Sequence, residues 1–154
     1  SYNGWGDVLV IIFFGFVPVG GTYYVQALTW TPDVTIASII CGLLIDTLLV
    51  VNNYRDREAD ARSGKRTVIV RFGEKFGRYF YLLLGISASL LCLYFLREGH
   101  IYAALLPQLY LVPHVLTWRR MVKIHSGKKL NSILGETSRN MLFMGILLAI
   151  GMIL

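Results

Sequence analysis

Five apolar runs, each close to the length of a helix that crosses a lipid bilayer, dominate the 154-residue sequence. The hydrocarbon core of a bilayer is about 30 Å thick, so a crossing helix needs about 20 mainly apolar residues. The runs cover approximately residues 7–29, 34–55, 75–96, 100–119 and 134–154. With 55% hydrophobic residues and a mean hydropathy of +0.58, the chain is too apolar for a soluble domain of this size. The sequence predicts an all-α, polytopic transmembrane helical bundle with about five spans.

Positively charged residues are concentrated in alternate connections between these runs. Eight Lys and Arg residues lie in residues 55–78, one is Arg97, five lie in residues 119–129, and residues 30–33 contain none. Cytoplasmic connections carry an excess of Lys and Arg. We therefore expect a multi-pass protein of the cell inner (cytoplasmic) membrane, with residues 52–78 facing the cytoplasm. The net charge of +6 falls in these connections, so it indicates contact with the lipid bilayer and no nucleic-acid partner.

The most polar stretch, NNYRDREADARSGKRTVIVRFG, runs from Asn52 to Gly73. In a helix, Asn53, Asp56 and Asp60 stand at i, i+3 and i+7 and share one face. Two carboxylates four residues apart repel by roughly 0.2–0.5 kcal/mol unless a cation lies between them. Mg²⁺ prefers oxygen ligands and commonly binds one or two carboxylates together with phosphate oxygens. The spacing therefore indicates a metal site at Asp56 and Asp60.

Two cations follow the acids directly. Gly64 provides a helix stop four residues after Asp60, and Lys65 and Arg66 come next, where a phosphate group would reach them. The order reads as a metal site followed by a phosphate site. A solvated helix end held by salt bridges fits the same spacing, and from the spacing alone both interpretations remain open.

The residues of this stretch resemble a known family. NNYRDREAD followed by SGKRTVIVRFG is similar to the second aspartate-rich motif of the UbiA superfamily of intramembrane prenyltransferases, NNxRDxxxDxxxGKxTxxVRxG. Within that superfamily it is most similar to the 1,4-dihydroxy-2-naphthoate polyprenyltransferases of menaquinone synthesis. GTYYVQ at residues 21–26 and the tail LNSILGETSRNMLFMGILLAIGMIL resemble segments of the same enzymes. The three matches occur in the right order and cover nearly the whole chain.

The resemblance implies a Mg²⁺-dependent transferase. Asp56 and Asp60 would be the catalytic residues that hold Mg²⁺ on the diphosphate of a polyprenyl donor, and Asn53, Lys65 and Arg66 would bind the diphosphate. The polyprenyl group would pass to 1,4-dihydroxy-2-naphthoate, with loss of carbon dioxide, to form a demethylmenaquinone. Metal ions and cations stabilise such a leaving group, and an enclosed cavity excludes the water that would quench a carbocation.

The family's first aspartate-rich motif, of the form NDxxDxxxD, does not occur in residues 1–51. We therefore expect residues 1–154 to be the C-terminal half of a UbiA-type bundle, and the start at Ser1 without Met agrees with this expectation. Its partner would be a missing N-terminal half that carries the first motif. The chain alone is then expected to be inactive.

Four further residues are candidates for a pocket. Tyr23, Tyr24 and Gln26 form the polar end of the first run, where the resemblance implies an acceptor pocket and where an interfacial aromatic belt is the plain alternative. Asp46 lies well inside the second run, two turns before Asn53 on the same face. An ionisable group at membrane depth faces the protein interior or a water-filled cavity by default. Asp46 is therefore expected to line a cavity or to form a buried structural hydrogen bond.

Other functions remain open at this stage. Within the family, the acceptor would be another compound such as 4-hydroxybenzoate, a haem or a chlorophyllide. Outside it, the acidic residues would line the path of a transporter or channel, or the chain would be a structural membrane module without activity. The Gly64-Lys65-Arg66 run favours phosphate binding, because cations beside the acids would hinder a cation path.

Overall fold

The computed structural model describes residues 5–154, which form helices joined by short connections. In chain order the elements are α1 (Gly6–Val10), η1 (Ile11–Gly20), α2 (Gly21–Ala27), α3 (Pro32–Arg62), α4 (Val68–Phe72), α5 (Glu74–Leu91), η2 (Cys92–Leu96), α6 (Ile101–Leu105), η3 (Leu106–Tyr110), α7 (Leu111–Ile124), η4 (Lys128–Leu130) and α8 (Asn131–Ile153). No strand occurs in this part of the chain, so the predicted all-α fold is confirmed.

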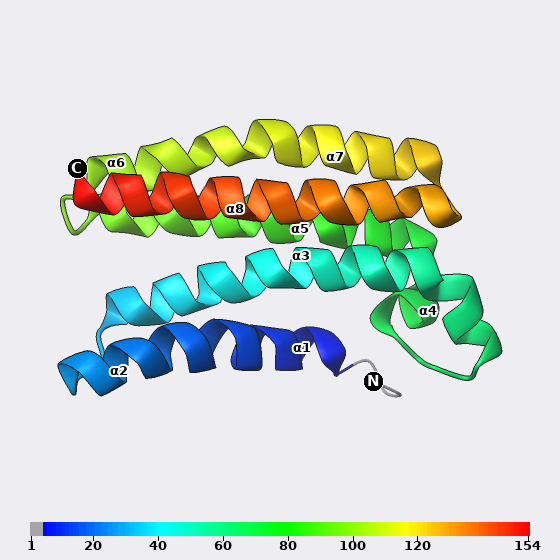
Figure 1. The fold of residues 1–154 in the computed structure, drawn as a ribbon, viewed down its shortest axis with the longest axis horizontal. Helices are drawn as coiled ribbons and strands as arrows, with labels where there is room; N and C mark the ends of the chain where they lie inside the picture. The colour runs from blue at the N-terminus through cyan, green and yellow to red at the C-terminus, as the bar shows by residue number, and fades with distance from the viewer. Residues whose placement is uncertain (1–4) are drawn as a thin grey trace.

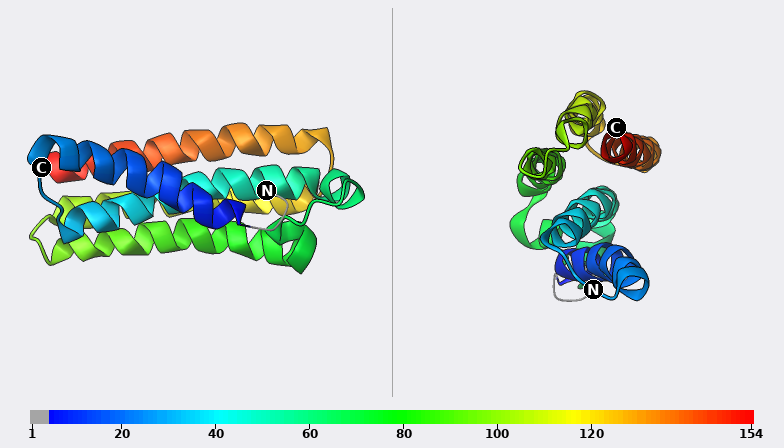
Figure 2. Two further views of the ribbon diagram at one scale, coloured as in Figure 1. Left: turned by 90° about the horizontal axis from the view of Figure 1, so that it is seen from below. Right: turned by 90° about the vertical axis from the view of Figure 1, so that its left-hand side faces the viewer.

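The helices lie side by side along one long axis (Figure 1). α1, η1 and α2 form one continuous first helix, antiparallel to α3, and η1 is a π-helical stretch that contains Pro18. On the other side of α3 lie α5, the α6–α7 run and α8 (Figure 2). α4 and the connection between α7 and α8 lie at the same end of the bundle as the end of α3 (Figure 1). The two strongly basic connections therefore share one end, as their alternation along the chain predicts.

Four helical runs within residues 5–154 are long and apolar enough to cross a membrane. They are Gly6–Ala27, Pro32–Arg62, Glu74–Leu96 and Lys128–Ile153. The fourth run expected from the sequence, 100–119, lies in α6, η3 and α7, where the 3₁₀-helical η3 with Pro107 interrupts the α-helix. This segment still extends beside α5 and α8 along the bundle (Figure 1). The count of five spans stays a prediction.

Local interactions explain why α3 begins and ends where it does. The Thr31 side-chain oxygen accepts a hydrogen bond from the backbone N–H of Val34, which caps the first turn. At the other end Gly64 has φ +75°, a left-handed conformation that glycine adopts without a Cβ penalty. The chain reverses there, and the backbone N–H of Lys65 donates to the carbonyl oxygen of Asp60 over 3.0 Å. Lys65 therefore lies next to Asp60 in the last turn of α3.

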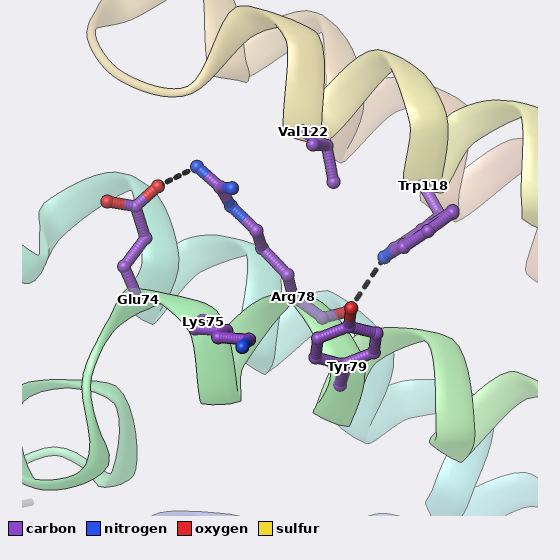
Figure 3. Close-up of a pocket in the computed structure, with 6 residues that line it drawn as sticks. All are labelled: Glu74, Lys75, Arg78, Tyr79, Trp118 and Val122. Carbon is purple, nitrogen blue, oxygen red and sulfur yellow. Dashed lines mark hydrogen bonds and ion pairs between the residues drawn. The ribbon is translucent and has the colours of Figure 1, made fainter.

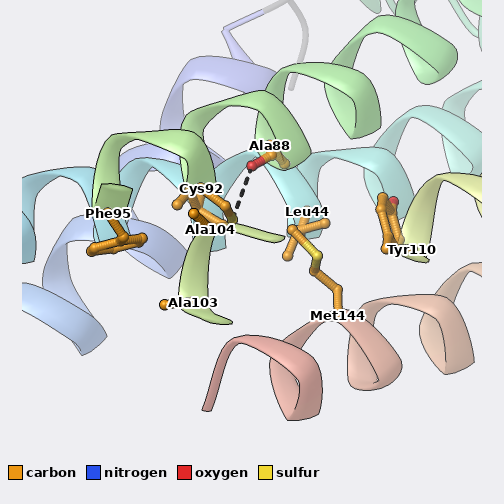
Figure 4. Close-up of a cluster of buried hydrophobic side chains, with 9 residues drawn as sticks. Leu44, Ala88, Cys92, Phe95, Ala103, Ala104, Tyr110 and Met144 are labelled. Carbon is orange, nitrogen blue, oxygen red and sulfur yellow. Dashed lines mark hydrogen bonds between the residues drawn. The ribbon is translucent and has the colours of Figure 1, made fainter. Parts of the chain in front are cut away.

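Two clusters of buried apolar side chains hold the bundle together. The first, shown in Figure 4, consists of Ile40, Leu44, Ala88, Cys92, Phe95, Ala103, Ala104, Tyr110 and Met144. The second surrounds the last turns of α3 and consists of Val50, Val51, Tyr54, Ile69, Tyr81, Leu84, Met121, Leu130 and Ile133. Lipid tails are as apolar as these side chains, so close van der Waals packing stabilises a membrane bundle more than transfer out of water does.

The first helix and α3 approach one another through glycines. A Cβ atom added at Gly15 would lie 2.4 Å from the carbonyl oxygen of Ser38, and one added at Gly42 would lie 2.9 Å from the Cα atom of Ile11. Small residues allow helices to approach closely in membranes. We call this contact the first-helix seam, defined by Gly15, Ile11, Ser38 and Gly42.

Gly15→Ala tests this seam. The added methyl group meets backbone atoms that have no free rotamer, so we expect a loss of about 1–3 kcal/mol in the free energy of unfolding. The measurement is thermal or denaturant unfolding of the protein in detergent. Gly21→Ala is the matched control in the same helix, because a Cβ at Gly21 has no heavy atom within 4 Å. Equal unfolding curves for the two variants would contradict the seam.

Candidate active site

Asp56 lies in the last turns of α3 and is held by its neighbour. The Arg55 guanidinium donates from Nε and Nη2 to the two carboxylate oxygens of Asp56, each over 2.7 Å. Arg55 also donates to the side-chain oxygen of Asn52 over 2.6 Å and to that of Asn131 in α8 over 3.0 Å. The side chain of Asp56 is 42% exposed. Arg55 therefore orients this carboxylate at the surface and ties it to the start of α8.

Asp60 stands one turn further along and is almost enclosed, with a side chain that is 10% exposed. The Lys65 ammonium donates to its Oδ1 over 3.1 Å. The Ser63 hydroxyl donates to the Asp60 carbonyl oxygen over 3.0 Å. Asn53 is half-buried and precedes Asp56 by three residues on α3. Each acid of the motif therefore faces its own cation, Asp56 with Arg55 and Asp60 with Lys65.

Arg66 lines a cavity of about 600 Å³ together with Trp5, Val70 and Arg71. The two arginines come from the turn after α3 and from α4. Guanidinium groups bind phosphate oxygens in bidentate geometry, so two of them in one cavity suit a phosphate-bearing ligand. Sequence reasoning assigned no role to Arg71. The sequence does mark this residue, because Arg71 is the arginine of the VRxG portion of the motif.

A second group of charged side chains fixes the position of α3. The Glu74 carboxylate pairs with Arg78 on its own helix, with Arg57 of α3 at 3.5 Å, and with His125 after α7 at 2.5 Å. Its Oε1 also accepts a hydrogen bond from the hydroxyl of buried Tyr54 over 2.7 Å. Glu74 thus joins α3, α5 and the α7–α8 connection at one point. Spacing along the chain indicates only the Glu74–Arg78 pair at i, i+4, because Arg57 and His125 lie far from Glu74 in the sequence.

Beside Glu74 a cavity of about 440 Å³ opens between α5 and α7 (Figure 3). Its lining residues are Glu74, Lys75, Arg78, Tyr79, Trp118 and Val122. The Trp118 indole N–H donates to the backbone carbonyl oxygen of Arg78 over 2.9 Å, as drawn in Figure 3. Neither this cavity nor the one at Arg66 and Arg71 is lined by an acid of the motif, and only the latter is lined by residues of the motif's basic segment.

The predicted pocket residues are distributed over a different part of the molecule. Tyr23 and Gln26 line a cavity of about 590 Å³ between the first helix, α3, η2 and α8, which also includes Asp33. Asp33 precedes Asp56 by 23 residues of α3, or about 35 Å of helix. Tyr24 is 52% exposed. The structure therefore does not bring this end of the first helix to the aspartate motif.

Asp46 is also separate from the motif. Its side chain is fully buried, and it lies ten residues before Asp56, about 15 Å along α3. Neither of its carboxylate oxygens has a hydrogen-bond partner within residues 5–154. A buried carboxyl group without a partner is costly.

Comparison with known proteins places the chain in a family. Residues 1–145 match the UbiA prenyltransferase family. The chain belongs to the UbiA prenyltransferase family. It is 42% identical over 92 residues to a 1,4-dihydroxy-2-naphthoate octaprenyltransferase of Haemophilus influenzae and 41% identical over 93 residues to one of Escherichia coli. Each alignment covers 60% of this chain and 30% of the relative.

A more distant relative aligns with the whole chain. The UbiA prenyltransferase domain-containing protein 1 of Dictyostelium discoideum is 29% identical over 154 residues, which is 100% of this chain and 46% of that protein. The chain therefore spans less than half of the length of these UbiA relatives. No solved structure matches it.

The donor atoms of the UbiA motif fit a metal that is shared with a ligand. No group of three or more His, Cys, Asp and Glu side chains suitable for a metal lies within residues 5–154. Asp56 and Asp60 supply two carboxylates, and Mg²⁺ commonly completes such a pair with water and the oxygens of a substrate phosphate. The arrangement therefore suits Mg²⁺ bound together with a diphosphate better than Mg²⁺ bound by the protein alone.

Glu74→Gln tests how the UbiA motif is held in place. Loss of the negative charge leaves Arg57 and Arg78 close together without a counter-ion, so we expect a loss of about 1–3 kcal/mol in the free energy of unfolding. Unfolding in detergent and proteolysis of the α7–α8 connection measure the effect. Glu58→Gln removes an equivalent charge from an exposed position of α3 and should change either readout little. Equal behaviour of the two variants would show that the Glu74 network does not hold α3.

Proposed function

We propose that this chain forms the part of a prenyltransferase that binds the donor diphosphate. The observation that carries the proposal is the end of α3, where Asp56 and Asp60 stand one turn apart and the chain turns back at Gly64 to place Lys65 on Asp60. The guanidinium groups of Arg66 and Arg71 line the cavity that follows. Acids for a metal and cations for a phosphate thus occur within one short segment of the folded chain.

The cations of this segment neutralise its acids now and would bind the diphosphate once Mg²⁺ neutralises the acids. In the present state Arg55 and Lys65 neutralise the two acids. A diphosphate bound at Arg66 and Arg71 would offer oxygens to the same cations, while Asp56 and Asp60 would hold Mg²⁺ against it. When bound, Mg²⁺ supplies positive charge that stabilises the departing pyrophosphate. Asn53, on the same face of α3, would add a polar contact to the diphosphate.

The proposed reaction is transfer of a polyprenyl group from polyprenyl diphosphate to 1,4-dihydroxy-2-naphthoate, with release of pyrophosphate and carbon dioxide. The direct product is the quinol form of a demethylmenaquinone. The names of the bacterial relatives support this acceptor, and the motif residues of this chain support the donor. Lys65 beside Asp60 also argues against a cation path, because an ammonium group there repels a passing cation. The basic connections at the motif end of the bundle support an inner-membrane protein whose motif faces the cytoplasm.

We further propose that catalysis requires a second half of the bundle that carries a first aspartate-rich motif. A diphosphate carries several negative charges, and residues 1–51 supply no second acidic motif to hold metal against them. The partial alignment with the bacterial relatives agrees with this proposal.

The first test is the change of Asp56 or Asp60 to Asn in the complete enzyme. Each change keeps the shape of the side chain and removes one charge from the proposed metal site. We expect kcat/KM to fall on the order of 10²-fold, about 2.7 kcal/mol, with an increased requirement for Mg²⁺. The measurement is prenyl transfer to 1,4-dihydroxy-2-naphthoate as Mg²⁺ is varied.

Glu58→Gln serves as the control because Glu58 is exposed and lies away from the face of Asp56 and Asp60. It should retain near-normal kcat/KM. A salt-bridged helix end without metal would give small changes of similar size at all three positions. If Asp56→Asn and Asp60→Asn kept normal turnover at limiting Mg²⁺, the metal assignment would be wrong.

The second test uses the 154-residue chain alone, purified and reconstituted in lipid. We expect no prenyl transfer, because only one of the two proposed acidic motifs is present. Addition of an N-terminal UbiA half that carries the NDxxD-type motif should restore transfer, and the same half with its acids changed to Asn should not. Turnover by the chain alone would refute the requirement for a second motif.

A further inference from the structure

Two acidic side chains lie buried between the first helix and α3, away from the diphosphate site. Asp7 of α1 is 7% exposed and Asp46 of α3 is 0% exposed. Ionisable side chains at membrane depth are expensive and by default indicate a functional site. The prenyl-transfer chemistry proposed above uses neither of them.

The register of the first-helix seam brings the two acids to one level. Gly42 of α3 packs on Ile11 of η1, where a Cβ at Gly42 would lie 2.9 Å from the Ile11 Cα atom. Asp46 follows Gly42 by one turn, and Asp7 precedes Ile11 by one turn. Because the first helix and α3 are antiparallel (Figure 1), these two turns lie side by side. This register places Asp7 and Asp46 on neighbouring turns of the two packed helices.

Neither acid pairs with a cation among the described residues, and the arginines of α3 begin only at Arg55, more than two turns after Asp46. Both carboxylate oxygens of Asp46 and Oδ1 of Asp7 lack a hydrogen-bond partner among residues 5–154. The first 54 residues of the sequence contain no Lys, Arg or His. Two ionised carboxylates buried together without a cation would repel strongly, because the surrounding medium screens them poorly.

The helices on the other side of α3 do not supply the missing charge. On α5, buried Tyr81 uses its hydroxyl in a hydrogen bond with Thr137 of α8. On α8, Glu136 pairs with Arg120 of α7 at 2.6 Å, and Arg139 is exposed. η1 contains no titratable side chain. Arg66 and Arg71 line a cavity with Trp5, two residues before Asp7, but Asp7 Oδ1 has no hydrogen-bond partner among residues 5–154.

We propose that Asp7 and Asp46 share one proton, as a carboxylic acid that donates a hydrogen bond to a carboxylate across the first-helix seam. One proton from water converts two facing acceptors into a donor and an acceptor, which satisfies an oxygen on each side. A hydrogen bond from O–H to a carboxylate is among the strong ones. The bound proton thus fastens the first helix to α3 inside the membrane.

A proton fits this place better than a metal ion. At Asp56 and Asp60 water and phosphate oxygens would complete the shell of Mg²⁺, whereas the buried pair Asp7 and Asp46 supplies at most four oxygens to ions that take six or more. No third His, Cys, Asp or Glu joins the pair within the described part of the chain. A shared proton needs only the two facing oxygens.

Infrared spectroscopy of the purified protein at neutral pH tests the proposal directly. We expect the carbonyl stretch of a protonated carboxyl group, which exposed Asp and Glu side chains do not show at this pH. Asp46→Asn should abolish the band, because the amide donates the hydrogen bond to Asp7 in place of the acid. Glu98→Gln, at an exposed acid outside the seam, should leave the band unchanged.

Stability as a function of pH provides a second readout. An unfolded chain releases these protons above about pH 4, and the folded pair keeps one, so folding binds a proton and stability falls as pH rises. We expect the unfolding temperature of the wild type in detergent to fall by roughly 5 °C between pH 6 and pH 9. Asp7→Asn and Asp46→Asn should each flatten this dependence, and Glu98→Gln should not.

Three results would overturn the proposal. The first is the absence of the infrared band in the wild type, and the second is its persistence in Asp46→Asn. The third is stabilisation of the wild type, but not of Asp46→Asn, by millimolar Na⁺ or Mg²⁺ at constant pH. The last result would identify a metal ion as the occupant. If Asp46→Asn failed to fold, the band and the pH dependence measured in Asp7→Asn would decide the question, and an unaltered pH dependence there would refute the shared proton.

Discussion

The Glu74 carboxylate is the contact on which the arrangement of the motif end depends. α3 ends in a row of charged side chains, and the second apolar cluster reaches along this helix only as far as Tyr54. Glu74 supplies that position by binding Arg57 of α3, Arg78 of α5 and His125 after α7. Tyr54 completes the contact from the buried side of α3. The acids that follow on α3 are therefore presented from a fixed helix and not from a mobile connection.

The helical fold and the acidic face were predictable from the sequence for physical reasons. A bilayer offers no hydrogen bonds to the backbone, so apolar runs of about 20 residues must be helical. The spacing of Asp56 and Asp60 then places both on one face, and Gly64 predicts the helix stop that follows them. Each of these inferences uses only neighbours within about one or two helical turns.

The remaining features depend on contacts between distant segments, which periodicity does not encode. The pairing of Arg55 with Asn131 and the approach of Asp7 to Asp46 each join helices that are far apart in the sequence. The same limit explains Tyr23 and Gln26. Their motif resembles a segment of the naphthoate enzymes, but they share a cavity with Asp33, which lies about 35 Å along α3 from Asp56.

The first-helix seam also has a mechanical consequence. At Gly15 and Gly42 the two helices meet backbone to backbone, so a tilt of one helix requires the same tilt of the other. α3 has 31 residues and is therefore about 46 Å long. A tilt of about 5° about the first residue of α3 displaces Asp60 by about 4 Å and Asp56 by about 3 Å. A movement of the first helix at the far end of the bundle therefore changes the position of Asp56 and Asp60.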